Sequence, residues 1–287
     1  MWEASKKALS ASENDEFRSN FTRGLIQTNC VSSHTQANRF SHIPKVIVQF
    51  WHDKTIPGDV RECAKTWAQL EDSGYTHKIF NINDAEDFIN EKLGKRQVEA
   101  FDRCYHPAMK SDYFRLCYIF SNGGFYVDTD DVYTGINIDP FFENKKLNLQ
   151  PLCYDLNSNT MIPPEKFIGD RPFSNKWIFY FNNNPIIAPA KDPVIEYALR
   201  RSTNIILDCD TTDLPEIQST TGPGNLTASI VAYFLTNESL IPEEHLNVLS
   251  DWNNIVSTVW DLSYRKDNRN WRLSNRKNYW DLLTKEK

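Results

Sequence analysis

The stretch from Asn122 to Asp131 restricts the folds open to this chain more than any other part of the sequence. It reads Asn122-Gly123-Gly124-Phe125-Tyr126-Val127-Asp128-Thr129-Asp130-Asp131. The asparagine and the glycines are typical of a helix C-cap with positive φ, and the aromatic and β-branched residues after them favour a short strand. Because side chains alternate along an extended chain, Tyr126, Asp128 and Asp130 share one face. The stretch therefore predicts a helix, a sharp turn and a strand that ends in carboxylates.

Two carboxylates one residue apart at the mouth of a buried strand predict a site for a hard divalent cation. Mg²⁺ and Mn²⁺ take oxygen ligands and often add phosphate oxygens from a substrate. A calcium loop of the EF-hand kind is disfavoured, because Tyr133 and Asp139 stand where that loop needs Gly and Glu. For an isolated Asp-x-Asp pair, a solvated acidic turn is the simpler alternative to a metal site.

The segment from His106 to Phe120 predicts a helix with Pro107 in its first turn. Its apolar residues recur at helical spacing and predict a buried stripe: Tyr113, Leu116, Cys117 and Phe120. Asp112 and Arg115 are three residues apart on a neighbouring face. They form either a surface ion pair or, if this helix and the Asp128 strand converge on one ligand, a pair that faces phosphate and sugar hydroxyls.

The run from Lys110 to Arg115, followed by the run from Gly123 to Asp130, resembles the glycosyltransferases whose sugar-binding region contains a DXD motif. That family includes yeast-type outer-chain α-mannosyltransferases and bacterial transferases for capsule and lipopolysaccharide sugars. The pattern is also similar to that of the large clostridial glucosylating toxins. The clear resemblance covers about residues 43–135. It implies a GT-A-type α/β fold, a mostly parallel Rossmann-like sheet with helices on both faces and helical additions at both termini.

The order of elements along the chain agrees with such a sheet. Strands are expected at 43–51 and 75–80, and helices at 59–71, from an N-cap at Asp84, and at 97–104. This alternation predicts a mostly parallel sheet whose ligands bind beyond the C-terminal ends of the strands. Trp51 and Asp128 both follow such ends, so we expect them in one crevice. Residues 140–175, with several prolines, are expected to be a long irregular excursion, and the strand at 177–181 is expected to end in an asparagine turn.

Three parts are expected: an N-terminal extension (1–40), the transferase domain (41–263) and a basic, aromatic tail (264–287). The tail has eight basic and three acidic residues, a local charge of +5. One interpretation is that the tail contacts an anionic partner, either lipid headgroups or the acceptor. The other is a solvated helix that packs on the domain through its aromatic residues. A formal net charge of −6 disfavours a general nucleic-acid binder, and no apolar run is long enough for a transmembrane helix.

The resemblance assigns roles to individual residues. The catalytic candidates are Asp112, Arg115 and Asn183; the donor-binding candidates are Trp51, Asp112, Arg115, Tyr126, Asp128, Thr221 and Gly222; and the metal ligands are Asp128 and Asp130. The resemblance places Asn182 and Asn183 near the transferred sugar, with a polar turn as the plainer alternative. For Trp51, the plainer alternative is core packing. Family members often place a late histidine before Ser-Trp, but this chain has Trp260-Asp261 and Asn270-Trp271. Asp261, Asp267 and Asn268 are therefore only weak candidates for a third ligand.

The function that the resemblance implies is a retaining, Mn²⁺- or Mg²⁺-dependent transfer of a sugar from a nucleoside-diphosphate sugar. UDP-sugars are favoured over GDP-mannose, and the expected acceptor is a glycan in polysaccharide or lipopolysaccharide synthesis. The alternatives are a toxin-like transferase that modifies a protein side chain, a metal-dependent phosphohydrolase or nuclease, and a non-catalytic carbohydrate-binding protein. The expected location is the cytoplasm, at the inner face of a bacterial membrane if the tail binds lipid, or the Golgi lumen if an anchor was removed.

Overall fold

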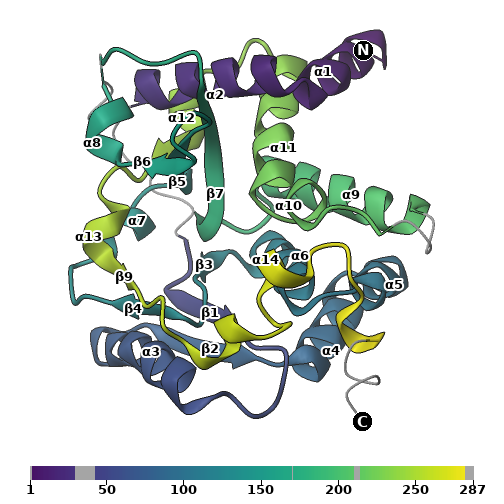
Figure 1. Cartoon of the computed structure of the whole chain (residues 1–287), viewed down its shortest axis with the longest axis vertical. Helices are drawn as coiled ribbons and strands as arrows, with labels where there is room; N and C mark the ends of the chain where they lie inside the picture. The colour runs from purple at the N-terminus through teal and green to yellow at the C-terminus, as the bar shows by residue number, and fades with distance from the viewer. Residues whose placement is uncertain (1, 30–42, 170, 210–213, 282–287) are drawn as a thin grey trace.

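The computed structural model describes residues 2–29, 43–169, 171–209 and 214–281, and a seven-stranded sheet forms its centre (Figure 1). The strand order is β2-β1-β3-β7-β5-β6, with β8 beside β5. The strands are β1 (Val46–Phe50), β2 (Thr76–Phe80), β3 (Gly124–Tyr126), β5 (Leu147–Asp155), β6 (Thr160–Ile162), β7 (Trp177–Ala188) and β8 (Leu246–Val248). From their pairings, five strands run in one direction, and β6 and β7 run against them. The predicted α/β class with a mostly parallel sheet is confirmed.

Helices cover both faces of this sheet, which confirms the layered arrangement (Figure 1). One face carries α4 (Ile82–Lys92), α5 (Lys95–Arg103), α6 (Pro107–Asn122), α9 (Pro193–Asp208) and α11 (Pro223–Thr236), and the other carries α3 (Gly58–Ala68), α7 (Asp139–Phe142) and α13 (Trp252–Ile255). Strand β3 shows the division most clearly. Tyr126 packs into the first core, whereas Phe125 and Val127 pack into the second, because successive side chains of a strand point to opposite faces.

The connection from α6 to β3 has the local structure that the sequence predicts. His106 is the N-cap of α6, and its ring accepts a hydrogen bond from the Ala108 N–H, while Pro107 occupies the first turn. Gly123 ends the helix with φ of +67°, and a Cβ at this position would lie 2.5 Å from the backbone nitrogen of Ala190. Glycine is therefore required both by its φ and by the close approach of the chain after β7.

The structure corrects three expectations about secondary structure. Residues 140–175 contain the long strand β5 instead of an irregular excursion, and Pro151 is accommodated where the pairing register of β5 shifts. The asparagines 182–184 continue the single twelve-residue strand β7 instead of forming a turn, and their side chains donate to Gln150, Asp112 and Asp131. The N-cap of α4 is Asn81, and Asp84 is the third residue of a capping box.

The shorter elements are η1 (Gln69–Ser73), β4 (Asp131–Tyr133), α8 (Pro164–Phe167), α10 (Ile217–Thr220), α12 (Pro242–His245), β9 (Val256–Thr258), η2 (Ser263–Lys266) and α14 (Trp271–Ser274). Helices α1 (Trp2–Glu13) and α2 (Asp15–Asn29) pack beside α11 and β7. The C-terminal segment, yellow in Figure 1, runs from β9 through η2 to α14, beside α6.

The predicted division at residues 40 and 263 stays a prediction. Residues 1 and 30–40 of the expected extension, 41–42, 170 and 210–213 of the expected domain, and 282–287 of the expected tail lie outside the described residues. Within the described ranges, no helix combines the length and the apolar character needed to cross a bilayer.

Candidate active site

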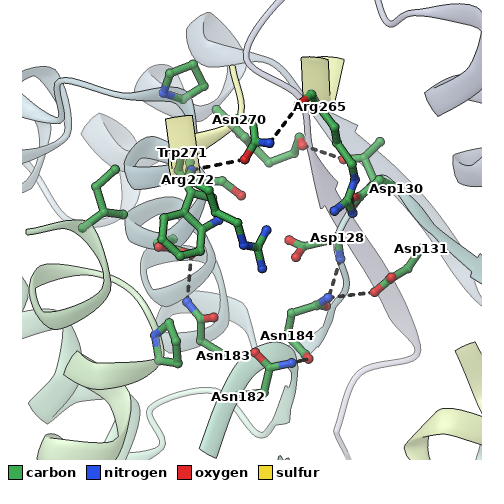
Figure 2. Close-up of a pocket in the computed structure, with 18 of the residues that line it drawn as sticks. Asp128, Asp130, Asp131, Asn182, Asn183, Asn184, Arg265, Asn270, Trp271 and Arg272 are labelled. Carbon is green, nitrogen blue, oxygen red and sulfur yellow. Dashed lines mark hydrogen bonds and ion pairs between the residues drawn. The ribbon is translucent and has the colours of Figure 1, made fainter. Parts of the chain in front are cut away.

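A cavity of about 460 Å³ opens beyond the C-terminal ends of β1 and β3, and Figure 2 shows residues that line it. Its volume lies within the range of small-molecule sites. Its walls come from the end of β1, helix α6, residues 128–131, the middle of β7, the approach to α11 and the C-terminal segment 258–272. The expected crevice at the strand ends, with Trp51 and Asp128 in one cavity, is therefore present.

Arg115 holds one side of this cavity together. It is 3% exposed, and its guanidinium donates to the Asn183 carbonyl (2.7 Å), the Ser111 Oγ (3.1 Å) and the Asp128 Oδ1 (2.8 Å). Burial lowers its pKa, but Asp128 and the other neighbours outweigh that effect and hold the pKa above its ordinary value. Arg115 is therefore a fixed positive charge between helix α6 and the carboxylates after β3.

Asp112 lies one helical turn before Arg115, 3.1 Å from its guanidinium. Its Oδ1 accepts from the Asn183 amide (2.8 Å), and its Oδ2 accepts from the Thr221 hydroxyl (3.3 Å). Gly222 lies close to both Asp112 and Gln218: a Cβ at this position would be 3.3 Å from the Asp112 Oδ2 and 2.9 Å from the Gln218 Cα. Burial raises the pKa of Asp112, whereas Arg115 and the two hydrogen bonds lower it. The structure thus brings α6, β7 and the turn before α11 together at one buried carboxylate.

Three carboxylates follow β3, and each is held by a different neighbour. Asp128 Oδ1 accepts from Arg115, Asp130 Oδ2 accepts from the Tyr264 hydroxyl (2.6 Å) and from Arg265, and Asp131 Oδ2 accepts from Asn184 (2.7 Å). Burial raises the pKa of Asp128 to about 6, although Arg115 opposes the shift, and Asp130 adds to it. Burial and the two neighbouring carboxylates also raise the pKa of Asp131.

Comparison with known proteins identifies this motif. Residues 32–145 match the family described as "Glycosyltransferase sugar-binding region containing DXD motif". The match covers about two fifths of the chain and includes both α6 and the carboxylates after β3. The chain is accordingly a glycosyltransferase, and the DXD of the family name corresponds in this sequence to Asp128-Thr129-Asp130.

A solved structure described as "PaToxG Glycosyltransferase" is similar to this glycosyltransferase over most of its length. The two chains are 16% identical, the match covers 94% of this chain and 95% of the other, and the TM-score is 0.47. A TM-score below 0.5 is too low to support an inference about function. No curated protein matches the chain.

The carboxylates of the glycosyltransferase fit a divalent cation in their chemistry. One oxygen of each of Asp128, Asp130 and Asp131 accepts the bonds given above, and no hydrogen bond from the described residues reaches the other. Ionised carboxylates buried near one another repel, and a cation between them would offset that repulsion. Within the described part of the chain, no group of three or more His, Cys, Asp and Glu residues is arranged to hold a metal. Phosphate oxygens and water would therefore complete the coordination.

The weak candidates for a third ligand lie away from the cavity wall. Asp261 is largely exposed and pairs with Lys266 (2.7 Å). Asp267 pairs with Arg269 (2.7 Å), and the Asn268 carbonyl accepts from the Ser274 hydroxyl (2.7 Å). Their positions give no support to a role as metal ligands, because each is bound to a neighbour within the C-terminal segment.

The donor-binding candidates divide into cavity-lining and supporting residues. Trp51 lines the cavity but is only 8% exposed, and its ring lies edge-on to Tyr264 with centroids 5.4 Å apart. Tyr126 is fully buried, and the Arg115 guanidinium lies 4.4 Å from its ring centroid. Neither Tyr126 nor Thr221 lines the cavity. In this structure, Tyr126 supports Arg115, and Thr221 with Gly222 supports Asp112.

Sequence reasoning missed several residues that the cavity contains. Asn184 accepts a hydrogen bond from the Asp128 N–H (3.0 Å) and donates to Asp131, so it links β7 to the carboxylates. The run of three asparagines is the available signal, but it does not distinguish Asn184 from its two neighbours. Arg265 and Tyr264 hold Asp130 from the C-terminal segment, more than 130 residues away in sequence. Local patterns cannot show a contact of that separation.

Proposed function

We propose that this glycosyltransferase moves a sugar from a nucleoside-diphosphate sugar, with UDP-sugars favoured over GDP-mannose, to a glycan acceptor in polysaccharide or lipopolysaccharide synthesis. The proposal includes dependence on Mn²⁺ or Mg²⁺ and retention of the anomeric configuration. One observation carries it: a single cavity contains Asp128 and Asp130 of the DXD motif together with Asp112, Arg115 and Asn183. These groups combine a cation site with charged and polar groups that suit a diphosphate and sugar hydroxyls.

In this proposal, Asp128 and Asp130 hold the cation, which would neutralise the charge that develops on the departing diphosphate. Arg115 keeps Asp128 oriented through the 2.8 Å contact and adds a permanent positive charge beside it. Asp112 and Asn183 hold each other at the neighbouring wall and lie where hydroxyls of a donor sugar would meet polar partners. Trp51 lines the same cavity and is proposed to contact the base.

Front-face displacement is the proposed route to retention. A double displacement needs a carboxylate that is free to attack the anomeric carbon. Asp112, which lies beside Asn183, has both oxygens engaged by hydrogen bonds and is 8% exposed, which makes it a poor nucleophile. In the front-face route, the sugar–phosphate bond breaks as the acceptor oxygen bonds to the same face of the sugar. The departing phosphate oxygen takes the acceptor proton.

A donor panel tests the proposal. UDP-glucose, UDP-galactose, UDP-N-acetylglucosamine and GDP-mannose are incubated with the enzyme, with and without Mn²⁺, and release of nucleoside diphosphate is measured. We expect one UDP-sugar to be hydrolysed slowly in a Mn²⁺-dependent reaction, without phosphodiesterase activity. Binding of free glycan that needs neither nucleotide nor metal would instead show a carbohydrate-binding protein.

Variants of the carboxylates test the metal site directly. Asp128→Asn and Asp130→Asn should each lower Mn²⁺-dependent turnover by about 10²–10⁴-fold, because each removes a charged ligand from the cation. Asp72→Asn is the matched control, since Asp72 is an exposed aspartate outside the cavity. Turnover at the parent rate in both cavity variants would refute the metal-dependent mechanism.

A further inference from the structure

The C-terminal segment contributes three arginines to the cavity wall: Arg265, Arg269 and Arg272. Two of them are already engaged by carboxylates. Arg265 pairs with Asp130. Arg269 makes a bidentate pair with Asp267, in which its Nε lies 3.0 Å from Oδ1 and its Nη2 lies 2.7 Å from Oδ2. No carboxylate of the described residues forms an ion pair with Arg272. Its positive charge is therefore available to a ligand anion.

The orientation of Arg272 places that charge where a ligand would lie. Figure 2 shows its guanidinium extending from α14 into the cavity, on the side where Asp128 lies. The guanidinium is 4.7 Å from the centroid of the Trp271 ring, a cation–π contact that favours this direction. The Asn270 side chain caps the backbone N–H of Arg272 and begins α14 there, so the base of the side chain is also held.

The charges around the cavity indicate what kind of anion fits. Asp128 and Asp130 keep an anion away from their side unless a cation lies between them and the ligand. Arg272 reaches the cavity from the opposite wall, which belongs to the C-terminal segment (Figure 2). A diphosphate can bind a carboxylate-held cation through one set of oxygens and a guanidinium through another.

We propose that Arg272 binds the diphosphate of the donor, so that the C-terminal segment supplies the phosphate-binding cation of this glycosyltransferase. The inference rests on the proposed function and adds a residue to it. It also assigns Arg272 of the basic tail to donor binding, whereas contact with anionic lipid was one of the alternatives that the sequence left open for the tail. A guanidinium at this position would bind phosphate oxygens directly, whereas a metal ligand in the C-terminal segment would act on the phosphate only through the bound cation.

Binding measurements on three proteins test the proposal: the parent enzyme, Arg272→Ala and Arg276→Ala. Arg276 is a matched control, because it is an exposed arginine of the same segment that does not line the cavity. Calorimetry measures the affinity for Mn²⁺ alone, for UDP with Mn²⁺ and for uridine. Losing one charge-assisted contact should weaken UDP binding by about 10–100-fold in Arg272→Ala. Mn²⁺ and uridine affinities should stay at parent values, and Arg276→Ala should bind UDP like the parent.

The outcomes separate this inference from the proposed function. If the parent binds UDP and Arg272→Ala binds it equally well, the inference is wrong and the proposed function stands. The same conclusion holds if Arg272→Ala loses only its binding to vesicles of anionic lipid. A parent enzyme that binds neither UDP nor GDP in the presence of Mn²⁺ would overturn the proposed function and this inference together. Arg272→Lys should retain part of the UDP affinity, because it keeps the charge and loses the planar fork.

Discussion

At the scale of single residues, the cavity is a set of buried charges that neutralise one another incompletely. One carboxylate oxygen of Asp128 accepts a hydrogen bond from Arg115, yet burial and the charge of Asp130 still raise the pKa of Asp128 to about 6. A folded-state pKa above the unfolded value of 3.8 means that the fold penalises the ionised form. The stabilisation that the protonated Asp128 carboxyl gives the fold is fully present below about pH 3.8, and it is lost as the pH rises through about 6.

The same shift predicts how cation binding depends on pH. A protonated Asp128 cannot serve as a metal ligand, so Mn²⁺ affinity should fall by about tenfold for each pH unit below 6 and level off above that value. Titration of the apoprotein with Mn²⁺ between pH 5 and 8, with the free ion followed by electron paramagnetic resonance, measures this dependence. Circular dichroism at each pH controls for unfolding. A constant affinity from pH 5 to 7 would contradict the prediction.

At the scale of elements, helix α6 and strand β7 position most of the polar groups. Helix α6 carries Asp112 and Arg115 on the side that meets β7, where Asn183 binds both of them. This contact is possible because Gly123 lets the chain turn directly into β3, while the residues after β7 pass close to the turn. The site therefore depends on a tight connection between α6 and β3 as much as on the charged residues themselves.

Substitution of Gly123 should be more costly than that of a positive-φ glycine whose Cβ would point into open space. Gly123→Ala adds a Cβ 2.5 Å from the Ala190 nitrogen and 2.9 Å from the Pro189 carbonyl carbon. We expect a loss of about 3–5 kcal/mol in the free energy of unfolding, from overpacking and backbone strain together. Gly135→Ala is the control: Gly135 also has positive φ, but its Cβ would meet nothing within 4 Å.

Urea unfolding of both variants measures the difference. Gly135→Ala should lose only the strain of an L-residue at positive φ, about 1–2 kcal/mol. Equal losses in the two variants would show that the close approach at Gly123 relaxes without cost.

At the scale of the whole molecule, the cavity joins segments from nearly the full length of the chain. Its wall begins with Phe50 and Trp51 and ends with Trp271 and Arg272. Asp130 after β3 and Arg265 in the C-terminal segment are joined across it. A ligand that contacts both the carboxylates and the C-terminal segment should therefore stabilise the entire fold.

Thermal unfolding tests this coupling. At a ligand concentration about 100 times Kd, Mn²⁺ and UDP together should stabilise the native state by about 2.7 kcal/mol, which corresponds to a rise in Tm of about 5 °C for a domain of this size. In Asp130→Asn, the part of the rise that requires Mn²⁺ should be lost. An unchanged Tm in the parent enzyme at saturating ligand would contradict this coupling.

The sequence by itself determined the α/β class, a helix over residues 106–120, the glycine turn and the carboxylates after β3. These features follow from local chemistry: a proline in the first helical turn, a glycine where φ must be positive, and side chains that alternate along a strand. The same local rules failed for β5 and β7. Pro151 and the three asparagines favour turns, but strand pairing keeps Pro151 in β5, and side-chain hydrogen bonds to Gln150, Asp112 and Asp131 hold the asparagines in β7.

Only the tertiary structure decided which residues share the cavity with those carboxylates. Asn184, Tyr264, Arg265 and Arg272 reach it from positions distant in sequence, and periodicity carries no information about such contacts. It also decided that Tyr126 and Thr221 support their neighbours beneath the cavity surface. Burial and pairing of charges depend on elements that meet only after folding, so the sequence could name the acidic motif and Arg115 but not Arg265 and Arg272 of the C-terminal segment.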